Sequence, residues 1–135
     1  MRKIVLLPLI FLSYQNWAAT SRDLDKTDLM WDGTRLPSQA LDNPEVTIKE
    51  IVIEPGEQLP LHHHPVINAG LLLEGQLTVV NKDTHKTLQL NQGDTIVELI
   101  NKTHYGKNNG DIPAKIVVFY LAEKGQPVTV TDSQQ

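Results

Sequence analysis

From residue 46 onward, short apolar segments alternate with short polar segments along the chain. Predicted strands cover residues 46–54, 61–64, 69–73, 76–81, 86–90, 95–100, 114–122 and 127–131, and most of them are rich in Val, Ile or Leu. Gly, Pro, Asn and Asp separate these segments, and they favour turns. Strands at intervals of about ten residues are typical of a β-sandwich or β-barrel. Because no segment after residue 45 shows a helical period of 3.6 residues, the pattern predicts an all-β domain.

The turns between the predicted strands also suggest how neighbouring strands pair. Glu74 and Gly75 separate residues 69–73 from residues 76–81, so we expect these two segments to form a hairpin. Asn, Asp and Gly mark further turns at residues 81–84, 91–94 and 108–111. Gly75 ends a strand at a position where the turn needs a positive φ angle.

The first 19 residues have the layout of a secretory signal peptide. Basic Arg2 and Lys3 precede nine residues, 4–12, that are apolar apart from one proline, and the small residues Ala18 and Ala19 follow. Nine residues are too few to cross a bilayer, which needs roughly 20. A buried N-terminal strand or helix is the alternative. We predict that residues 1–19 are removed on export to the periplasm, which leaves no membrane anchor.

Residues 20–45 are polar and resemble a loop, with Trp31, Leu36 and Leu41 as apolar anchors. We expect them to form an N-terminal arm that wraps or swaps onto the barrel domain of residues 46–131. The 135 residues are enough for one domain, and the 40% apolar content is that of a globular protein.

Charge and cysteine content exclude several classes of function. The net charge is −4 and no basic stripe is present, so nucleic-acid binding has no support. The sequence contains no cysteine. Disulfides, thiolate metal ligands and a cysteine nucleophile are therefore excluded.

Histidines form the most informative pattern in the chain. His62 and His64 are two residues apart, so on a strand their imidazoles point to the same side. His104 would complete a three-nitrogen site from a neighbouring strand. Three imidazoles suit one divalent ion of Fe, Mn, Ni, Zn, Co or Cu, and they leave a coordination position open for a small molecule. We expect His63 to face the opposite way and His85 to be solvated.

The two histidine segments resemble the two motifs of the cupin family. In the first motif, Gly56 precedes His62 and His64, and Gly75 closes the segment at the family spacing. Asn68 stands where the family has Glu. The segment is similar to those of small single-domain bacterial cupins.

In the second motif, Gly93, His104 and Asn108 keep the family spacing, while Leu99 replaces Pro and Asn101 replaces Gly. The resemblance covers roughly residues 45–123. It implies a cupin-type double-stranded β-helix, or jelly-roll barrel, in a single domain, and a homodimer.

The resemblance also implies a ligand set. His62, His64 and His104 are the expected metal ligands, and Asn68 is a weak ligand or a hydrogen-bond partner of a ligand histidine. An amide oxygen is a weaker donor than a carboxylate, so the change should weaken metal binding. Glu98 would replace the missing acid if its side chain pointed inward. Trp31 and Tyr105 are candidates for covering the mouth of the pocket, and Asn108 is expected to satisfy loop backbone.

Three functions fit these features, and no catalytic residue is assigned. The first is a metal-dependent enzyme of the oxygenase or isomerase type that acts on a small organic molecule. The second is a non-catalytic module that binds a metal or a small ligand. The third is a partner-binding barrel with a vestigial site.

Overall fold

The computed structural model describes residues 19–133, and within them the chain forms nine strands and no helix. The strands are β1 (Pro44–Ile53), β2 (His62–His63), β3 (Ile67–Glu74), β4 (Gln76–Asn81), β5 (Thr87–Asn91), β6 (Thr95–Val97), β7 (His104–Lys107), β8 (Ala114–Glu123) and β9 (Val130–Thr131). The predicted signal peptide, apart from Ala19, lies outside the described residues. In residues 19–133 there is also no helix long and apolar enough to cross a membrane.

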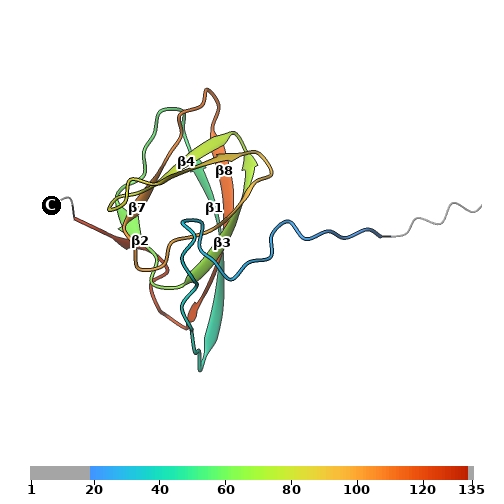
Figure 1. Ribbon diagram of the computed structural model, residues 1–135, viewed down its shortest axis with the longest axis vertical. Helices are drawn as coiled ribbons and strands as arrows, with labels where there is room; N and C mark the ends of the chain where they lie inside the picture. The colour runs from blue at the N-terminus through green and yellow to red at the C-terminus, as the bar shows by residue number, and fades with distance from the viewer. Residues whose placement is uncertain (1–18, 134–135) are drawn as a thin grey trace, which may run out of the picture.

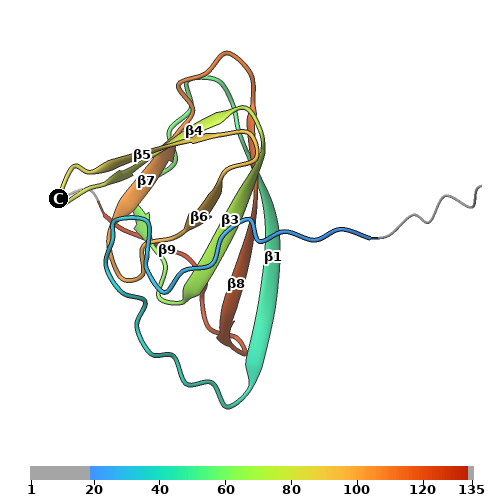
Figure 2. The same cartoon turned by 45° about the vertical axis from the view of Figure 1, so that its right-hand side comes forward.

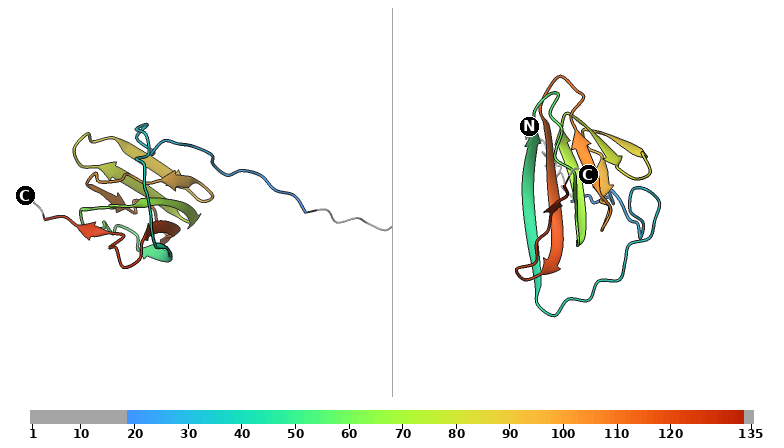
Figure 3. Two further views of the ribbon diagram at one scale, coloured as in Figure 1. Left: turned by 90° about the horizontal axis from the view of Figure 1, so that it is seen from below. Right: turned by 90° about the vertical axis from the view of Figure 1, so that its left-hand side faces the viewer.

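The strands form two facing sheets. One sheet has four strands in the order β1-β8-β3-β6, and the other has five in the order β5-β4-β7-β2-β9. The long strands β1 and β8 form one wall, and the second sheet lies opposite them (Figures 1 and 3). The all-β prediction and the jelly-roll barrel are confirmed.

The long pair β1 and β8 shows why these residues form strands. The two strands pair antiparallel over ten positions, from Pro44 opposite Glu123 to Ile53 opposite Ala114. Every second residue of β8 from Ala114 to Ala122 is buried. This period of two places one side of the strand in the barrel and the other outside it.

The barrel interior holds one aliphatic core between the sheets. Its buried side chains include Ile53, Val66 and Leu72 from residues 53–72 and Ile116 and Val118 from β8. Each such side chain contributes about 1.5–3 kcal/mol when it leaves water. Ile53, Ile116 and Val118 also line the cavity described below.

The predicted hairpin around Glu74 and Gly75 is wrong. β3 pairs with β6 and β8, whereas β4 pairs with β5 and β7, so the chain crosses from one sheet to the other at Gly75. Gly75 has a φ of 75°, and a Cβ atom there would lie 2.5 Å from the carbonyl oxygen of Pro113. Glycine is therefore needed at this corner because the backbone at Gly75 closely approaches the backbone at Pro113. A hairpin turn would also favour glycine, so the residue alone does not distinguish a hairpin from a crossing between sheets.

The strand predicted over residues 95–100 ends at Val97. Beyond it, Leu99 and Ile100 are buried against Met30 of the arm, and Asn101 adopts a φ of 56°. Asparagine tolerates this left-handed conformation better than most residues, so it can stand where the cupin motif has Gly. Leu99, which replaces the motif proline, is fully buried beneath the arm.

The arm packs on the barrel of its own chain (Figure 2). Met30, which was not among the predicted anchors, is buried, and Trp31 donates a backbone hydrogen bond to Val97 at 2.9 Å. Asp32 accepts a hydrogen bond from Lys102 at 2.5 Å. These contacts hold the arm beside the segment that leads from β6 to His104.

Leu72 and its neighbour Leu73 provide a matched test of this core. Leu72 is fully buried, whereas Leu73 is 40% exposed on the outside of the same strand. We expect Leu72→Ala to lower the free energy of unfolding by about 2–5 kcal/mol and Leu73→Ala to change it by less than about 1 kcal/mol. Urea denaturation of both variants checks this, and equal losses would contradict the assignment of the interior face.

Candidate metal centre

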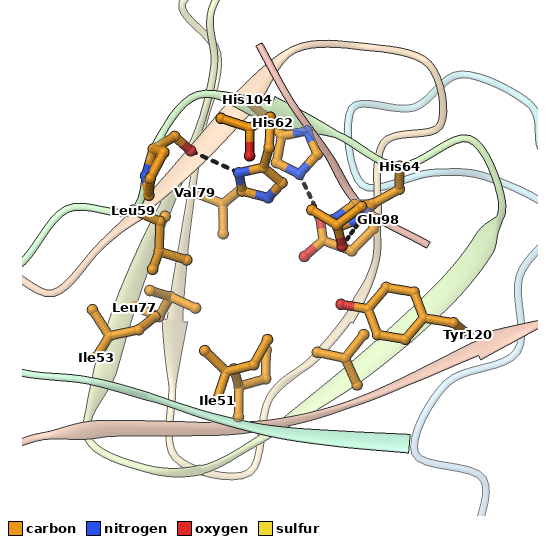
Figure 4. A pocket seen from close by; sticks show the side chains of 16 residues that line it. Ile51, Ile53, Leu59, His62, His64, Leu77, Val79, Glu98, His104 and Tyr120 are labelled. Atoms are coloured by element: carbon orange, nitrogen blue, oxygen red, sulfur yellow. Dashed lines mark hydrogen bonds and ion pairs between the residues drawn. The ribbon is translucent and has the colours of Figure 1, made fainter. Parts of the chain in front are cut away.

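Three histidines from β2, the residue that follows it and β7 meet at one wall of the barrel. His62 on β2 lies directly opposite His104 on β7, and His64 follows β2 and bridges to Ile100. The ring centroids are 4.6 to 5.1 Å apart, and one nitrogen of each ring lies within 4.8 Å of the others. The rings face a common space (Figure 4). The structure therefore brings together the three histidines that the sequence singled out.

The backbone fixes the tautomer of each ring. Each Nδ1 atom lies 2.8 to 2.9 Å from a carbonyl oxygen, which belongs to Pro60 for His62, to Val128 for His64 and to Lys102 for His104. A carbonyl oxygen only accepts hydrogen bonds, so Nδ1 carries the proton in each ring. Each Nε2 atom then carries a lone pair and no proton, which is the state in which a histidine nitrogen binds a metal ion.

Burial keeps these rings neutral. It lowers the pKa of His64 to about 3, and it lowers the pKa values of His62 and His104 as well. The Nε2 atom of His104 is buried without a hydrogen-bond partner. A buried polar atom without a partner is costly, and a shared cation would remove that cost.

The spacing also fits one ion. An ion about 2.1 Å from each of two ligand atoms holds them roughly 3.0–4.2 Å apart. The three nitrogens lie within 4.8 Å of one another, so a small closure of the rings would bring all of them into reach. The donor set, its protonation and its spacing all suit a divalent transition metal.

Glu98 points into the same space from the end of β6. Its Oε2 atom lies 3.5 Å from the Nε2 atom of His104 and has no hydrogen-bond partner. Burial raises the pKa of Glu98 to about 7, although the neighbouring His62 counteracts part of the rise. The sequence left the orientation of the Glu98 side chain open, and the structure shows that it points into the cavity.

Asn68 lies beside the cavity rather than on its wall. It is buried on β3, its Nδ2 atom donates a hydrogen bond to the carbonyl oxygen of Val66 at 3.0 Å, and its Oδ1 atom has no partner. The residues that line the cavity do not include it. The structure thus gives little support to Asn68 as a ligand.

The other polar candidates have structural surroundings. His63 turns away from the site and pairs with Asp132 at 2.8 Å. His85 is exposed in a turn and has a φ of 58°. Asn108 is fully buried and donates to the carbonyl oxygens of Ile53 and Ile112, as expected for a residue that satisfies loop backbone.

Trp31 and Tyr105 do not line the cavity. Sequence reasoning instead missed Tyr120, whose ring lies 5.5 Å from that of His64. Burial raises the pKa of Tyr120, so its hydroxyl stays protonated and can donate a hydrogen bond. Its place in the alternation of residues 114–122, in phase with Ile116 and Val118, is the signal that identifies it as an inward residue.

A cavity of about 220 Å³ extends from the histidines into the barrel. Its far side is aliphatic and includes Ile51, Ile53, Leu59, Leu77, Ile116 and Val118. Thr129 and Thr131 also line the cavity, and none of the Lys and Arg residues within residues 19–133 does. The three imidazoles, Glu98 and Tyr120 therefore form one polar wall of an otherwise apolar space (Figure 4).

A family model described as a cupin domain matches residues 49–120, which is more than half of the chain. The chain therefore belongs to the cupin family. No curated protein matches the sequence.

Many solved structures share the fold. The DMSP lyase DddQ from Ruegeria pomeroyi DSS-3 matches 64% of this chain at 19% identity with a TM-score of 0.56. The polyketide cyclase RemF from Streptomyces resistomycificus matches 68% at 20% identity with a TM-score of 0.55, which covers 64% of RemF. An oxalate oxidase in complex with the substrate analogue glycolate matches 64% at 25% identity with a TM-score of 0.53. The chain covers only 42% of the lyase and 45% of the oxidase.

The lowered histidine pKa values predict how the metal-free protein responds to acid. Each histidine has a folded pKa below its ordinary value of 6.5, so between the two values the unfolded chain binds more protons, and stability decreases as the pH is lowered. Glu98 acts oppositely between 4.5 and about 7, because there the folded state binds the extra proton. Each group changes stability by at most about 1.4 kcal/mol per pH unit, and three histidines outweigh one glutamate.

We therefore expect the metal-free protein to be less stable at pH 5 than at pH 6.5. Urea denaturation at both pH values measures the difference. The double variant His64→Gln/His104→Gln should reduce the difference, whereas His85→Gln, at an exposed position, should leave it unchanged. Equal or greater stability of the unsubstituted protein at pH 5 would contradict the neutral state of the buried rings.

Proposed function

We propose that this cupin is a metal-dependent enzyme of the oxygenase or isomerase type that acts on a small, largely apolar organic molecule. The proposed metal ligands are His62, His64 and His104. The observation that carries the proposal is the convergence of three neutral imidazoles, with one nitrogen of each within 4.8 Å of the others, on one wall of a largely apolar cavity. A bound divalent ion would supply Lewis acidity and an open position at that wall.

The cavity wall supports a substrate of this chemical class. Its aliphatic side favours an apolar body, and the absence of Lys and Arg from its lining leaves no side chain that would pair with a substrate carboxylate. Tyr120 offers a hydroxyl donor beside His64, where it would orient a polar atom of the substrate. A small neutral phenol, enol or ketone has this combination of an apolar body and one oxygen.

The second candidate is a binding module without turnover. It is favoured by Asn68, which removes a carboxylate from the position where the cupin motif places one. Incubation of metal-loaded protein with small phenols, enols and ketones separates the two candidates. Conversion that disappears in His104→Ala supports the enzyme, and tight binding with full recovery of the unchanged compound supports the module.

The proposal also includes export and a homodimer. Export to the periplasm rests on the signal-peptide layout of residues 1–19. The dimer rests on the outer side of β1 and β8, where Val46 lies opposite Leu121 and Ile48 lies opposite Phe119. These four apolar side chains are 39% to 62% exposed, and β1 is an edge strand. Such a patch on an edge is typical of a protein interface.

Metal content tests the proposed site most simply. Protein purified without a histidine tag should contain close to one equivalent of a transition metal, measured by elemental analysis. The double variant His62→Ala/His64→Ala should lose it, and the exposed-site control His85→Ala should keep it. Unsubstituted protein that takes up no metal, even after incubation with Fe, Mn, Ni, Zn, Co or Cu, would refute the proposed function.

The dimer has its own test. A lysine in the apolar patch should disrupt a self-complementary interface, so we expect Ile48→Lys to convert a dimer into a monomer in analytical ultracentrifugation. Gln92→Lys adds the same charge at the exposed turn between β5 and β6 and should leave the mass unchanged. A monomeric unsubstituted protein at micromolar concentration would contradict the dimer.

A further inference from the structure

Two buried atoms in the cavity wall lie close to each other, and neither makes a hydrogen bond. The Nδ1 proton of His104 is used by the carbonyl oxygen of Lys102, so Nε2 of this ring carries a lone pair. The Oε2 atom of Glu98 lies 3.5 Å away, and both atoms lack a hydrogen-bond partner. When the carboxyl group is ionised, two acceptors oppose each other in a buried setting, which is unfavourable unless a proton or a cation lies between them.

The distance between the two atoms favours a cation. A hydrogen bond from a protonated carboxyl group would bring the oxygen and nitrogen to roughly 2.5–3.0 Å. Two ligand atoms that share a tetrahedral ion at about 2.1 Å are about 3.4 Å apart. The observed 3.5 Å matches the second arrangement.

We propose that Glu98, and not Asn68, supplies a fourth and anionic ligand to the ion held by the three histidines. The inference rests on the proposed metal site and deepens it. The backbone pairing shows how the carboxylate of Glu98, at the end of β6, comes to lie next to Asn68 on β3. β6 pairs with β3, and the amide of Glu98 donates a hydrogen bond to the carbonyl oxygen of Asn68 at 3.1 Å. The two residues are therefore neighbours across the sheet.

The side chains of this pair have different surroundings. The carboxylate of Glu98 lines the cavity and faces His104. The amide of Asn68 is bound to its own strand through Val66 and lies outside the lining. A neutral residue at position 68 also avoids a second buried negative charge next to Glu98. The site then has three neutral imidazoles and one carboxylate, which leaves a divalent ion with one net positive charge.

Metal affinity distinguishes the two residues. Co²⁺ affinity, measured by competition with a chelator, should fall by at least about tenfold in Glu98→Gln, because the substitution removes the negative charge and keeps the shape. Asn68→Ala should keep the affinity within a few-fold. The visible spectrum of bound Co²⁺ should change in Glu98→Gln and stay the same in Asn68→Ala, since only the first substitution alters the coordinating atoms.

The exchange variant Asn68→Glu/Glu98→Gln returns the carboxylate to the neighbouring strand and keeps the charge of the site. We expect it to bind Co²⁺ more weakly than the unsubstituted protein, because position 68 does not line the cavity. Thermal denaturation of each metal-free variant verifies that it is folded. Unsubstituted protein without Co²⁺ binding refutes the metal site itself, whereas equal Co²⁺ affinity in Glu98→Gln and the unsubstituted protein overturns only the role of Glu98.

Discussion

Three hydrogen bonds between imidazole Nδ1 atoms and backbone carbonyl oxygens determine what this barrel can do. They fix the tautomer and the direction of His62, His64 and His104, so that three Nε2 lone pairs point toward one space. The carbonyl groups belong to the backbone, so the rings are held by the fold itself rather than by mobile side chains. Without a cation the Nε2 atom of His104 is buried and has no hydrogen-bond partner. The site is therefore preorganised for an ion.

The rest of the barrel supports this arrangement by burying the rings. The aliphatic wall opposite the histidines keeps the local dielectric low, which lowers the pKa values of the histidines and raises that of Glu98. All three shifts in the rings favour the neutral, ligating form, and ion binding would favour the ionised form of Glu98. The arm contributes through Met30, which covers Leu99 and Ile100 and so fixes the segment between Glu98 and His104.

The sequence predicted much of this and missed parts for physical reasons. A period of two placed His62 and His64 on one side, and motif spacing identified His104. The orientation of Glu98 could not be predicted, because the strand ends at Val97 and the positive φ of Asn101 breaks the alternation before His104. The sequence predicts a hairpin at Gly75, where the chain crosses between the sheets, because a hairpin turn and such a crossing both favour glycine. Met30 was overlooked because the arm around it is polar, and its partners come from distant residues.

We propose that the Nε2 atoms of the three histidines share one ion. The most direct test is a crystal structure of the metal-loaded protein, with anomalous diffraction recorded at the absorption edge of the bound metal. We expect a single anomalous peak about 2.1 Å from the Nε2 atoms of His62, His64 and His104. A peak bound elsewhere, or rings whose Nε2 atoms hydrogen-bond to protein groups in metal-soaked crystals without a peak, would contradict it.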